Sequence, residues 1–128
     1  NRFLSADFNQ LNSNSFSKSA GIDFSVSGMS YDANGNILSM NQKGWRLGGS
    51  LTIDSLQYGY FSGTNKLQYV YDRANDTASY LGDFKEGTNN TSQDYAYDGN
   101  GSLINDANKK ITQILYNHLN LPKQIHFR

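Results

Sequence analysis

The chain has 128 residues, the length of one domain or of a slice of a longer repeat array, with room for a single modest core. Eleven basic and eleven acidic residues cancel without a run of like charge, which speaks against a nucleic-acid or anionic-membrane surface. The absence of cysteine excludes disulfides and thiolate metal sites, and without an apolar stretch of about 18 residues we expect no membrane span.

Alternation of apolar and polar residues dominates the chain and predicts strands. We expect an all-β fold, an antiparallel meander of hairpins, within a single region spanning residues 1–128. A break in the alternation at Gly28 predicts a β-bulge. Two segments without a clear period, 9–20 and 75–92, read as irregular insertions between hairpins, the first as an exposed loop. The predicted strands lie near residues 3–8, 22–31, 36–42, 52–61, 66–72, 93–98, 102–106, 110–117 and 121–127.

The same alternation suggests which strand faces point inward. In the strand near 66–72 the apolar positions of one parity are Leu67, Tyr69 and Tyr71. At the end of the chain they are Leu119, Leu121, Ile125 and Phe127. We predict that both sets face a core.

One strand-turn-strand unit returns along the chain. Tyr31-Asp32-Ala33-Asn34-Gly35-Asn36 is followed by Tyr97-Asp98-Gly99-Asn100-Gly101-Ser102 and, more loosely, by Tyr116-Asn117-His118-Leu119-Asn120-Leu121. Asp at the first turn position accepts backbone hydrogen bonds and Gly takes a positive φ, which favours a type I turn with a left-handed residue after it. The predicted structural residues of turn and repeat are Tyr31, Asp32, Gly35, Asn36, Tyr97, Asp98, Gly101, Tyr116 and Asn117.

This pattern resembles the Rhs family, also called YD-repeat proteins. The resemblance rests on the three units above together with Tyr58-Gly59-Tyr60 and Asn65-Lys66-Leu67-Gln68-Tyr69-Val70-Tyr71-Asp72. Asn1-Arg2-Phe3-Leu4-Ser5-Ala6 resembles the back half of a preceding repeat, in the place that residues 65–69 occupy later. Ser102 and Asn117 depart from the family pattern and put the geometry of their own turns in doubt.

The resemblance implies a function of enclosure. In the family such hairpins spiral into a hollow β-shell around a toxin or effector segment, so the chain would be a non-catalytic slice of the shell of a bacterial polymorphic toxin. The parent protein would be secreted or displayed at the cell surface, and the partners would be neighbouring repeats and the enclosed segment. Since the chain opens on Asn1, we interpret it as an excised fragment that could dimerise through exposed strand edges.

Two binding hypotheses stand beside the structural one. Asp32, Asn34 and Asn36 offer oxygen ligands for calcium, but Lys43 stands where an EF-hand loop needs an acidic residue, so turn formation is favoured and we expect no metal. Trp45, in a predicted hairpin connection, is the best exposed-aromatic candidate. With Tyr58 and Tyr60 it could form a carbohydrate- or protein-binding module.

Catalysis finds little support in the sequence. The chain lacks the nucleophile elbow Gly-x-Ser-x-Gly and phosphate-binding signatures, so we expect neither an enzyme nor a cofactor. His118 is the single plausible base, and it and His126 are assigned to different strands. Four further acidic residues look dispersed and without partners: Asp7, Asp23, Asp54 and Asp83.

Overall fold

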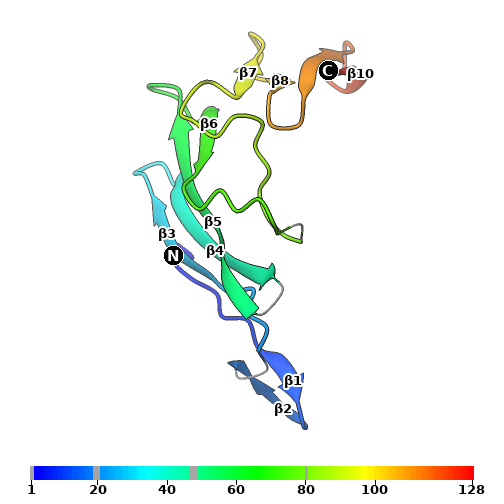
Figure 1. Cartoon of the computed structure of the whole chain (residues 1–128). Coiled ribbons are helices and arrows are strands. Elements are labelled where there is room, and N and C mark those ends of the chain that lie inside the picture. The colour runs from blue at the N-terminus through cyan, green and yellow to red at the C-terminus, as the bar shows by residue number, and fades with distance from the viewer. Residues whose placement is uncertain (1, 19–20, 47–48, 80) are drawn as a thin grey trace. The chain divides into compact units, whose positions relative to one another are not determined.

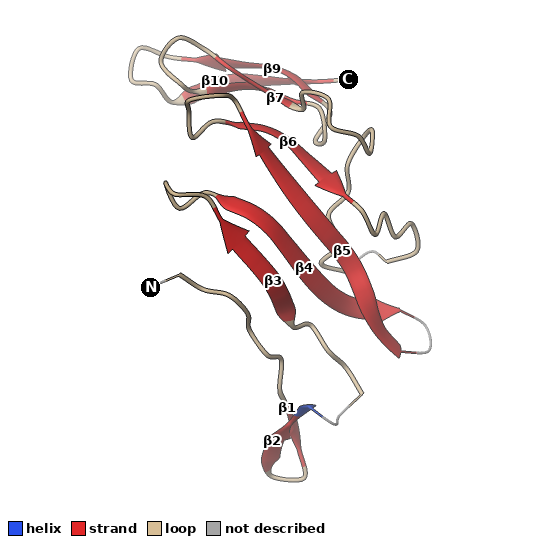
Figure 2. Ribbon diagram, turned by 90° about the vertical axis from the view of Figure 1, so that its left-hand side faces the viewer, coloured by secondary structure: helices blue, strands red, loops and turns tan. Residues whose placement is uncertain are grey.

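The computed structural model describes residues 2–18, 21–46, 49–79 and 81–128. It is all-β with antiparallel sheets, which confirms the predicted hairpin meander (Figure 2). Within these residues, no helix is long and apolar enough to cross a bilayer. The strands are β1 (Gln10–Asn12), β2 (Ser15–Ser17), β3 (Val26–Tyr31), β4 (Ile37–Arg46), β5 (Gly49–Tyr60), β6 (Leu67–Asp72), β7 (Tyr95–Tyr97), β8 (Leu103–Asp106), β9 (Ile111–Tyr116) and β10 (Pro122–Phe127).

The strands form three sheets (Figure 1). One four-stranded sheet has the order β3-β4-β5-β6, the other has the order β10-β9-β8-β7, and β1 pairs with β2 alone. The chain also divides into two compact units. Unit 1 comprises Asn1–Gln57 with Asp72–Phe84, and unit 2 comprises Tyr58–Tyr71 with Lys85–Arg128.

Unit 1 is built on the long hairpin of β4 and β5, whose pairing runs from Ser39↔Gln57 to Arg46↔Gly49. Its apolar core is small, with Ile53 fully buried and Leu56 nearly so. The predicted bulge at Gly28 is confirmed, because the register between β3 and β4 shifts at this point and Gly28 has a φ of +63°.

The beginning of unit 1 corrects two predictions. Residues 3–8 do not form a strand, since Ala6 makes only an isolated bridge to Val26, at which β3 begins. The loop predicted over 9–20 is wrong for its centre, where β1 and β2 form a short hairpin. Its turn places Ser13 at φ +48° and Asn14 at φ +69°, and the sequence carries no Gly there to announce such a turn. Residues 19–20 of this prediction lie outside the described residues.

In unit 2 the most buried apolar side chains are Val70, 2 % exposed, and Ile114. The prediction that Leu67, Tyr69 and Tyr71 face the core is wrong, because all three are half-buried and Val70 on the opposite face is the buried one. A segment outside the named strands pairs with the edge of β6. Asp94 lies along β6, its N–H donating to Gln68 O at 2.8 Å and its carboxylate accepting from Val70 N–H at 3.0 Å.

The C-terminal hairpin of β9 and β10 corrects another prediction. Its apolar side chains do not face a core: the exposed fractions are 65 % for Leu119, 56 % for Leu121, 45 % for Ile125 and 65 % for Phe127. They lie on or beside β10, which is an end strand of its sheet. No described part of the chain packs over them closely enough to bury them. This hairpin therefore has an uncovered apolar surface in the chain as it stands.

Candidate functional site

The repeated turn is one hydrogen-bonding scheme built on a single Asp. Asp32 N–H donates to Asn36 O at 3.0 Å, and Gly35 N–H donates back to Asp32 O at 3.2 Å. The Asp32 carboxylate closes the ring of contacts by accepting from Asn36 N–H at 2.8 Å. Gly35 takes a φ of +94°, which costs Gly little. The backbone N–H and C=O of Asp32, the N–H of Gly35 and both groups of Asn36 are thus satisfied within five residues.

The second copy repeats this scheme. Asp98 N–H donates to Ser102 O at 2.9 Å, Gly101 N–H donates to Asp98 O at 3.0 Å, and Ser102 N–H donates to the Asp98 carboxylate at 2.9 Å. Gly101 has a φ of +87°. Ser102 can replace Asn at the last position because its backbone N–H, not its side chain, makes the shared contact.

The third copy keeps the scheme with neither Asp nor Gly. Asn117 N–H donates to Leu121 O and Asn120 N–H donates to Asn117 O, both at 3.0 Å. The Asn117 side-chain oxygen accepts from Leu121 N–H at 3.1 Å, and Asn120 takes the positive φ, at +59°. Asn is the residue other than Gly that tolerates this conformation best, so the departures at Ser102 and Asn117 leave the turn intact.

The tyrosine of each copy is tied to an earlier segment, in an arrangement that we call the tyrosine clasp. Tyr31 donates its hydroxyl to Phe3 O at 2.5 Å, and the Arg2 guanidinium lies 5.5 Å from the centre of its ring. A cation over an aromatic face stabilises by about 0.5–1 kcal/mol at exposed sites. The clasp therefore joins Tyr31 to two adjacent residues about one hairpin earlier, Arg2 and Phe3. Arg2 also donates hydrogen bonds to Asp32 O at 2.6 Å and Ala33 O at 3.0 Å.

The clasp recurs in unit 2 with the corresponding residues. Tyr97 donates its hydroxyl to Leu67 O at 3.0 Å, and the Lys66 ammonium lies 5.6 Å from the ring centre. Burial raises the pKa of Tyr97, so its hydroxyl stays protonated and remains a donor at physiological pH. Tyr116 makes the hydroxyl contact as well, to Leu103 O at 2.6 Å.

Removing one clasp hydroxyl is expected to have a measurable cost. Tyr97→Phe keeps the ring under Lys66 but leaves Leu67 O without its donor, and should lower the free energy of unfolding by about 0.5–1.5 kcal/mol in urea denaturation. Tyr31→Phe should cost a similar amount. Tyr95→Phe is the control, since the Tyr95 hydroxyl meets Asn108 at a long 3.4 Å, and its cost should be smaller. A Tyr97→Phe variant with the same free energy of unfolding as the wild type would contradict the clasp.

The geometry of Asp32 favours the turn over calcium. Its two carboxylate oxygens accept from the backbone N–H and the side-chain Nδ2 of Asn36, each at 2.8 Å. The hydrogen bond from the Asn36 side chain is the main reason that the pKa of Asp32 lies below its usual range. Asn36 thus presents a donor, and not an oxygen ligand, to the carboxylate.

A shallow hollow of about 490 Å³ lies beside the second and third turns in unit 2. Much of its polar lining is engaged in hydrogen bonds within the protein. The Asn117 side-chain oxygen accepts from two backbone N–H groups, and Asn120 accepts from the Ser102 hydroxyl at 3.0 Å. The hollow is therefore best explained by the packing of the turns, and few polar groups in it are available to orient a ligand.

The predicted ligand-contact and base residues stand apart. Trp45 lies inside β4, not in a connection, and is 41 % exposed. It belongs to unit 1, whereas Tyr58 and Tyr60 belong to unit 2 and are half-buried. His118 lies in the third turn and not on a strand, which corrects that assignment, and His126 lies on β10.

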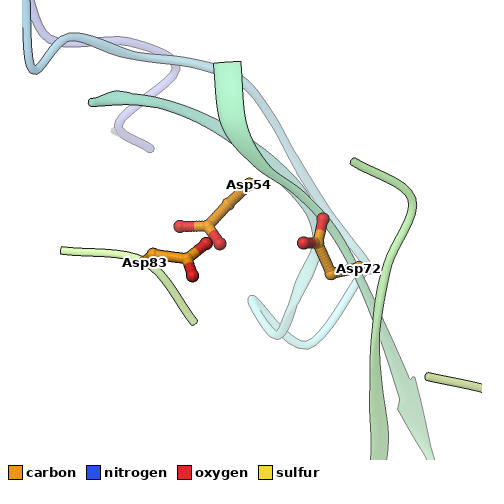
Figure 3. Close-up of side chains that lie close together, drawn as sticks. All are labelled: Asp54, Asp72 and Asp83. Atoms are coloured by element: carbon orange, nitrogen blue, oxygen red, sulfur yellow. The ribbon is translucent and has the colours of Figure 1, made fainter. Parts of the chain in front are cut away.

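The structure brings together three carboxylates that the sequence left scattered. Asp54, Asp72 and Asp83 each offer an oxygen, and these oxygens lie within 4.8 Å of one another (Figure 3). Asp54 is 1 % exposed and Asp72 is 2 % exposed. Asp72 belongs to a Tyr-Asp pair, but nothing in the local sequence predicts that Asp54 and Asp83 meet, because they are far apart in the chain.

Asp72 uses its carboxylate in the manner of the turn residues. It accepts from Ala74 N–H at 2.9 Å and Asn75 N–H at 2.8 Å, and also from Ser55 N–H on β5 at 2.7 Å. Asn75 has a positive φ of +43°, at the same offset from the Asp as Gly35, Gly101 and Asn120 in the other copies. The Tyr71-Asp72 pair thus begins a fourth turn, after which the described residues before β7 form no returning strand.

Asp54 is the member of the cluster with altered acidity. Burial raises its pKa to about 6, against the opposing hydrogen bond from Phe84 N–H, and the charges of Asp83 and Asp72 add to the rise. Such a carboxyl group can hold a proton at mildly acidic pH. Asp7 and Asp23 are separate from the cluster, each paired with a lysine: Lys18 at 2.6 Å and Lys43 at 2.9 Å. The expectation that all four aspartates lack partners is therefore wrong.

Comparison of the chain with known protein families, with curated proteins and with solved structures finds no match.

Proposed function

We propose that this chain is a non-catalytic, structural segment of an Rhs/YD-repeat shell that encloses a toxin or effector segment of its parent protein. One observation carries the proposal: the hydroxyl contact and the cation over the ring in the tyrosine clasp of Arg2, Phe3 and Tyr31 recur as Lys66, Leu67 and Tyr97. Recurrence of both the turn and the clasp is what a repeat wall requires, since each hairpin must fold locally and also attach to its predecessor. The parent would be a secreted or surface-displayed bacterial protein.

The side chains of the repeat are used for contacts within the protein, which supports a structural role more than a binding site. The Asp, Asn and Gly side chains and torsions satisfy the turn itself, and the Tyr hydroxyl satisfies a backbone carbonyl of an earlier segment. These groups are thereby engaged in holding neighbouring segments in register. The mechanism is enclosure: strand pairing and clasps make a surface, and no bond is broken.

The proposal is tested on the parent polypeptide. We expect the coding sequence on either side of this segment to contain further Tyr-Asp units with a clasp cation before a Leu or Phe. Electron microscopy of the purified parent should then show a hollow particle with density inside it. Flanks without such units, or a solid particle, would refute the assignment.

The uncovered C-terminal hairpin predicts that the isolated 128-residue chain self-associates. The end strand β10 carries Ile125 and Phe127 with large exposed fractions, so strand addition buries both its edge and its apolar face. Light scattering should show a concentration-dependent rise in mass. Phe127→Lys should reduce the rise, whereas Leu81→Lys, at an equally exposed site outside any strand, should not. A strictly monomeric wild-type chain at high concentration would contradict the prediction.

The second candidate is a carbohydrate- or protein-binding module, favoured by the exposure of Trp45 on β4. A saturable change in tryptophan fluorescence with sugars from a glycan array, lost in Trp45→Ala, would establish it. Unchanged fluorescence across the array would leave Trp45 as an exposed strand residue.

A further inference from the structure

We propose that the end of the loop after β6, residues 81–84, is latched onto β5 by a proton shared between Asp54 and Asp83, so that this end of the loop is held more firmly in acid than at neutral pH. The proposal concerns unit 1 alone and does not rest on the enclosure function. It assigns a task to the pair of carboxyl groups that the turn and clasp do not use.

The geometry places the latch at the far end of the loop. The loop starts at Asp72, whose carboxylate binds three backbone N–H groups, and that anchor involves no shared proton. It ends where Phe84 N–H donates to Asp54 Oδ1 at 2.9 Å. Carboxyl oxygens of Asp54 and Asp83 lie within 4.8 Å of each other, and the two carboxyl groups turn toward each other in Figure 3. Both oxygens of Asp83 are shielded from solvent.

Two carboxyl groups can hydrogen-bond only if one of them carries a proton. With the proton present the contact is attractive and closes the loop. With the proton removed, two negative charges face each other in a poorly solvated site, and opening the loop lets water reach them. The elevated pKa of Asp54, to about 6, is what this geometry should produce.

Among the groups around Asp54, no described cation offsets the negative charge of the carboxyl groups, so a bound proton is the main group that can neutralise it. Asp72 faces it from β6 and Asp83 from the loop, and both are acidic. On β4 the residue opposite is Gln42, a neutral side chain that donates to Gly82 O at 3.2 Å and helps to hold the loop. The neighbouring lysine, Lys43, is engaged with Asp23.

The sign follows from the direction of the shift. Because the folded pKa of Asp54 lies above the unfolded value, the closed loop binds more protons than the open one, and closure is favoured below the folded pKa and weakened as pH rises through it. A shift from the usual value of 3.8 to about 6 should weaken closure about 10-fold between about pH 5 and about pH 7.5.

The test is hydrogen exchange of the Phe84 amide, measured by NMR on the whole chain and corrected for the intrinsic exchange rate. Protection in the wild type should fall about 10-fold between about pH 5 and about pH 7.5. Asp54→Asn should keep protection high and nearly constant with pH, because the amide supplies a permanent donor. Asp7→Asn, an exposed site in the same unit, should retain the wild-type pH dependence.

Three results would overturn the latch. The first is protection of Phe84 that does not change with pH in the wild type. The second is a wild-type dependence that survives in Asp54→Asn. The third is restoration of acid-level protection at neutral pH by millimolar calcium, which would make the cluster a cation site. If Asp54→Asn does not fold, the carboxyl carbon resonances of the wild type decide: a midpoint near 6 for Asp54 supports the latch and one near 4 refutes it.

Discussion

Asp72→Ala is expected to lower the free energy of unfolding by about 3–5 kcal/mol, the largest single effect that we predict for this chain. The side chain is 2 % exposed and accepts hydrogen bonds from the N–H groups of Ser55, Ala74 and Asn75. Alanine removes a carboxylate that is itself buried and leaves three amides without their partner, those of half-buried Ser55 and of exposed Ala74 and Asn75. An amide left unsatisfied away from water costs about 1–3 kcal/mol. Relief of repulsion with Asp54 offsets part of this cost. Urea denaturation followed by circular dichroism measures the difference.

The matched control for Asp72 is Asp98, which holds the same place in a Tyr-Asp turn. The Asp98 side chain is half-buried where Asp72 is 2 % exposed, and it binds the amides of Asn100 and Ser102 alone among the described contacts, so water can more easily replace the carboxylate. We expect Asp98→Ala to cost about 1 kcal/mol. Equal costs for the two substitutions would mean that burial of the fourth turn does not matter. Asp72→Asn should lie between them, because one side-chain oxygen is kept.

Gly59→Ala is the second large effect, with an expected loss of about 1–3 kcal/mol. A Cβ at Gly59 would lie 2.1 Å from Cε1 and 2.3 Å from Cζ of the Tyr69 ring, far closer than two non-bonded carbon atoms can approach. The ring packs directly over the glycine on the neighbouring strand, so it or the backbone of β5 must move. A thermal denaturation series detects the loss.

Two further variants show whether the ring is the cause. Gly99→Ala is the control, because nothing lies within 4 Å of its Cβ, and its effect should stay within about 0.5 kcal/mol. Tyr69→Val removes the obstructing ring, so Gly59→Ala should cost much less in a Tyr69→Val background than in the wild type. A cost that is the same in both backgrounds would place the strain elsewhere.

The turns are the part of the structure that the sequence predicted best. Asp at the first position and Gly at the positive-φ position gave the reversals at 32–35 and 98–101, and Asn served both purposes in the third copy. Each turn depends on residues within five positions of one another, so a local reading suffices. The hairpin of β1 and β2 is equally local but was missed. Its turn residues Ser13 and Asn14 take positive φ without the glycine that usually signals such a turn.

From β3 onward the strands lie close to their predicted positions, but residues 3–8 form no strand, the β1–β2 hairpin was missed, and the inward faces were predicted wrongly on two strands. Alternation gives two sets of side chains on opposite faces, and nothing local says which set another segment covers. On β6 the buried side chain is Val70 and not those of the opposite face, and on β10 no described segment buries Ile125 or Phe127. Predicting burial from the apolar residues alone therefore failed on both strands.

The sequence by itself determined the repeat: an all-β chain with recurring Tyr-Asp turns, whose reversals follow from short-range hydrogen bonds and torsional preferences. The tertiary structure alone decided what those turns hold together. It placed the Tyr31 and Tyr97 hydroxyls on distant backbone carbonyls, with a cation over each tyrosine ring. It also brought Asp54 close to Asp83 across a long separation in the chain. These contacts depend on strand pairing and burial, which change the dielectric surroundings of a side chain and the partners that it can reach, and no local pattern encodes either.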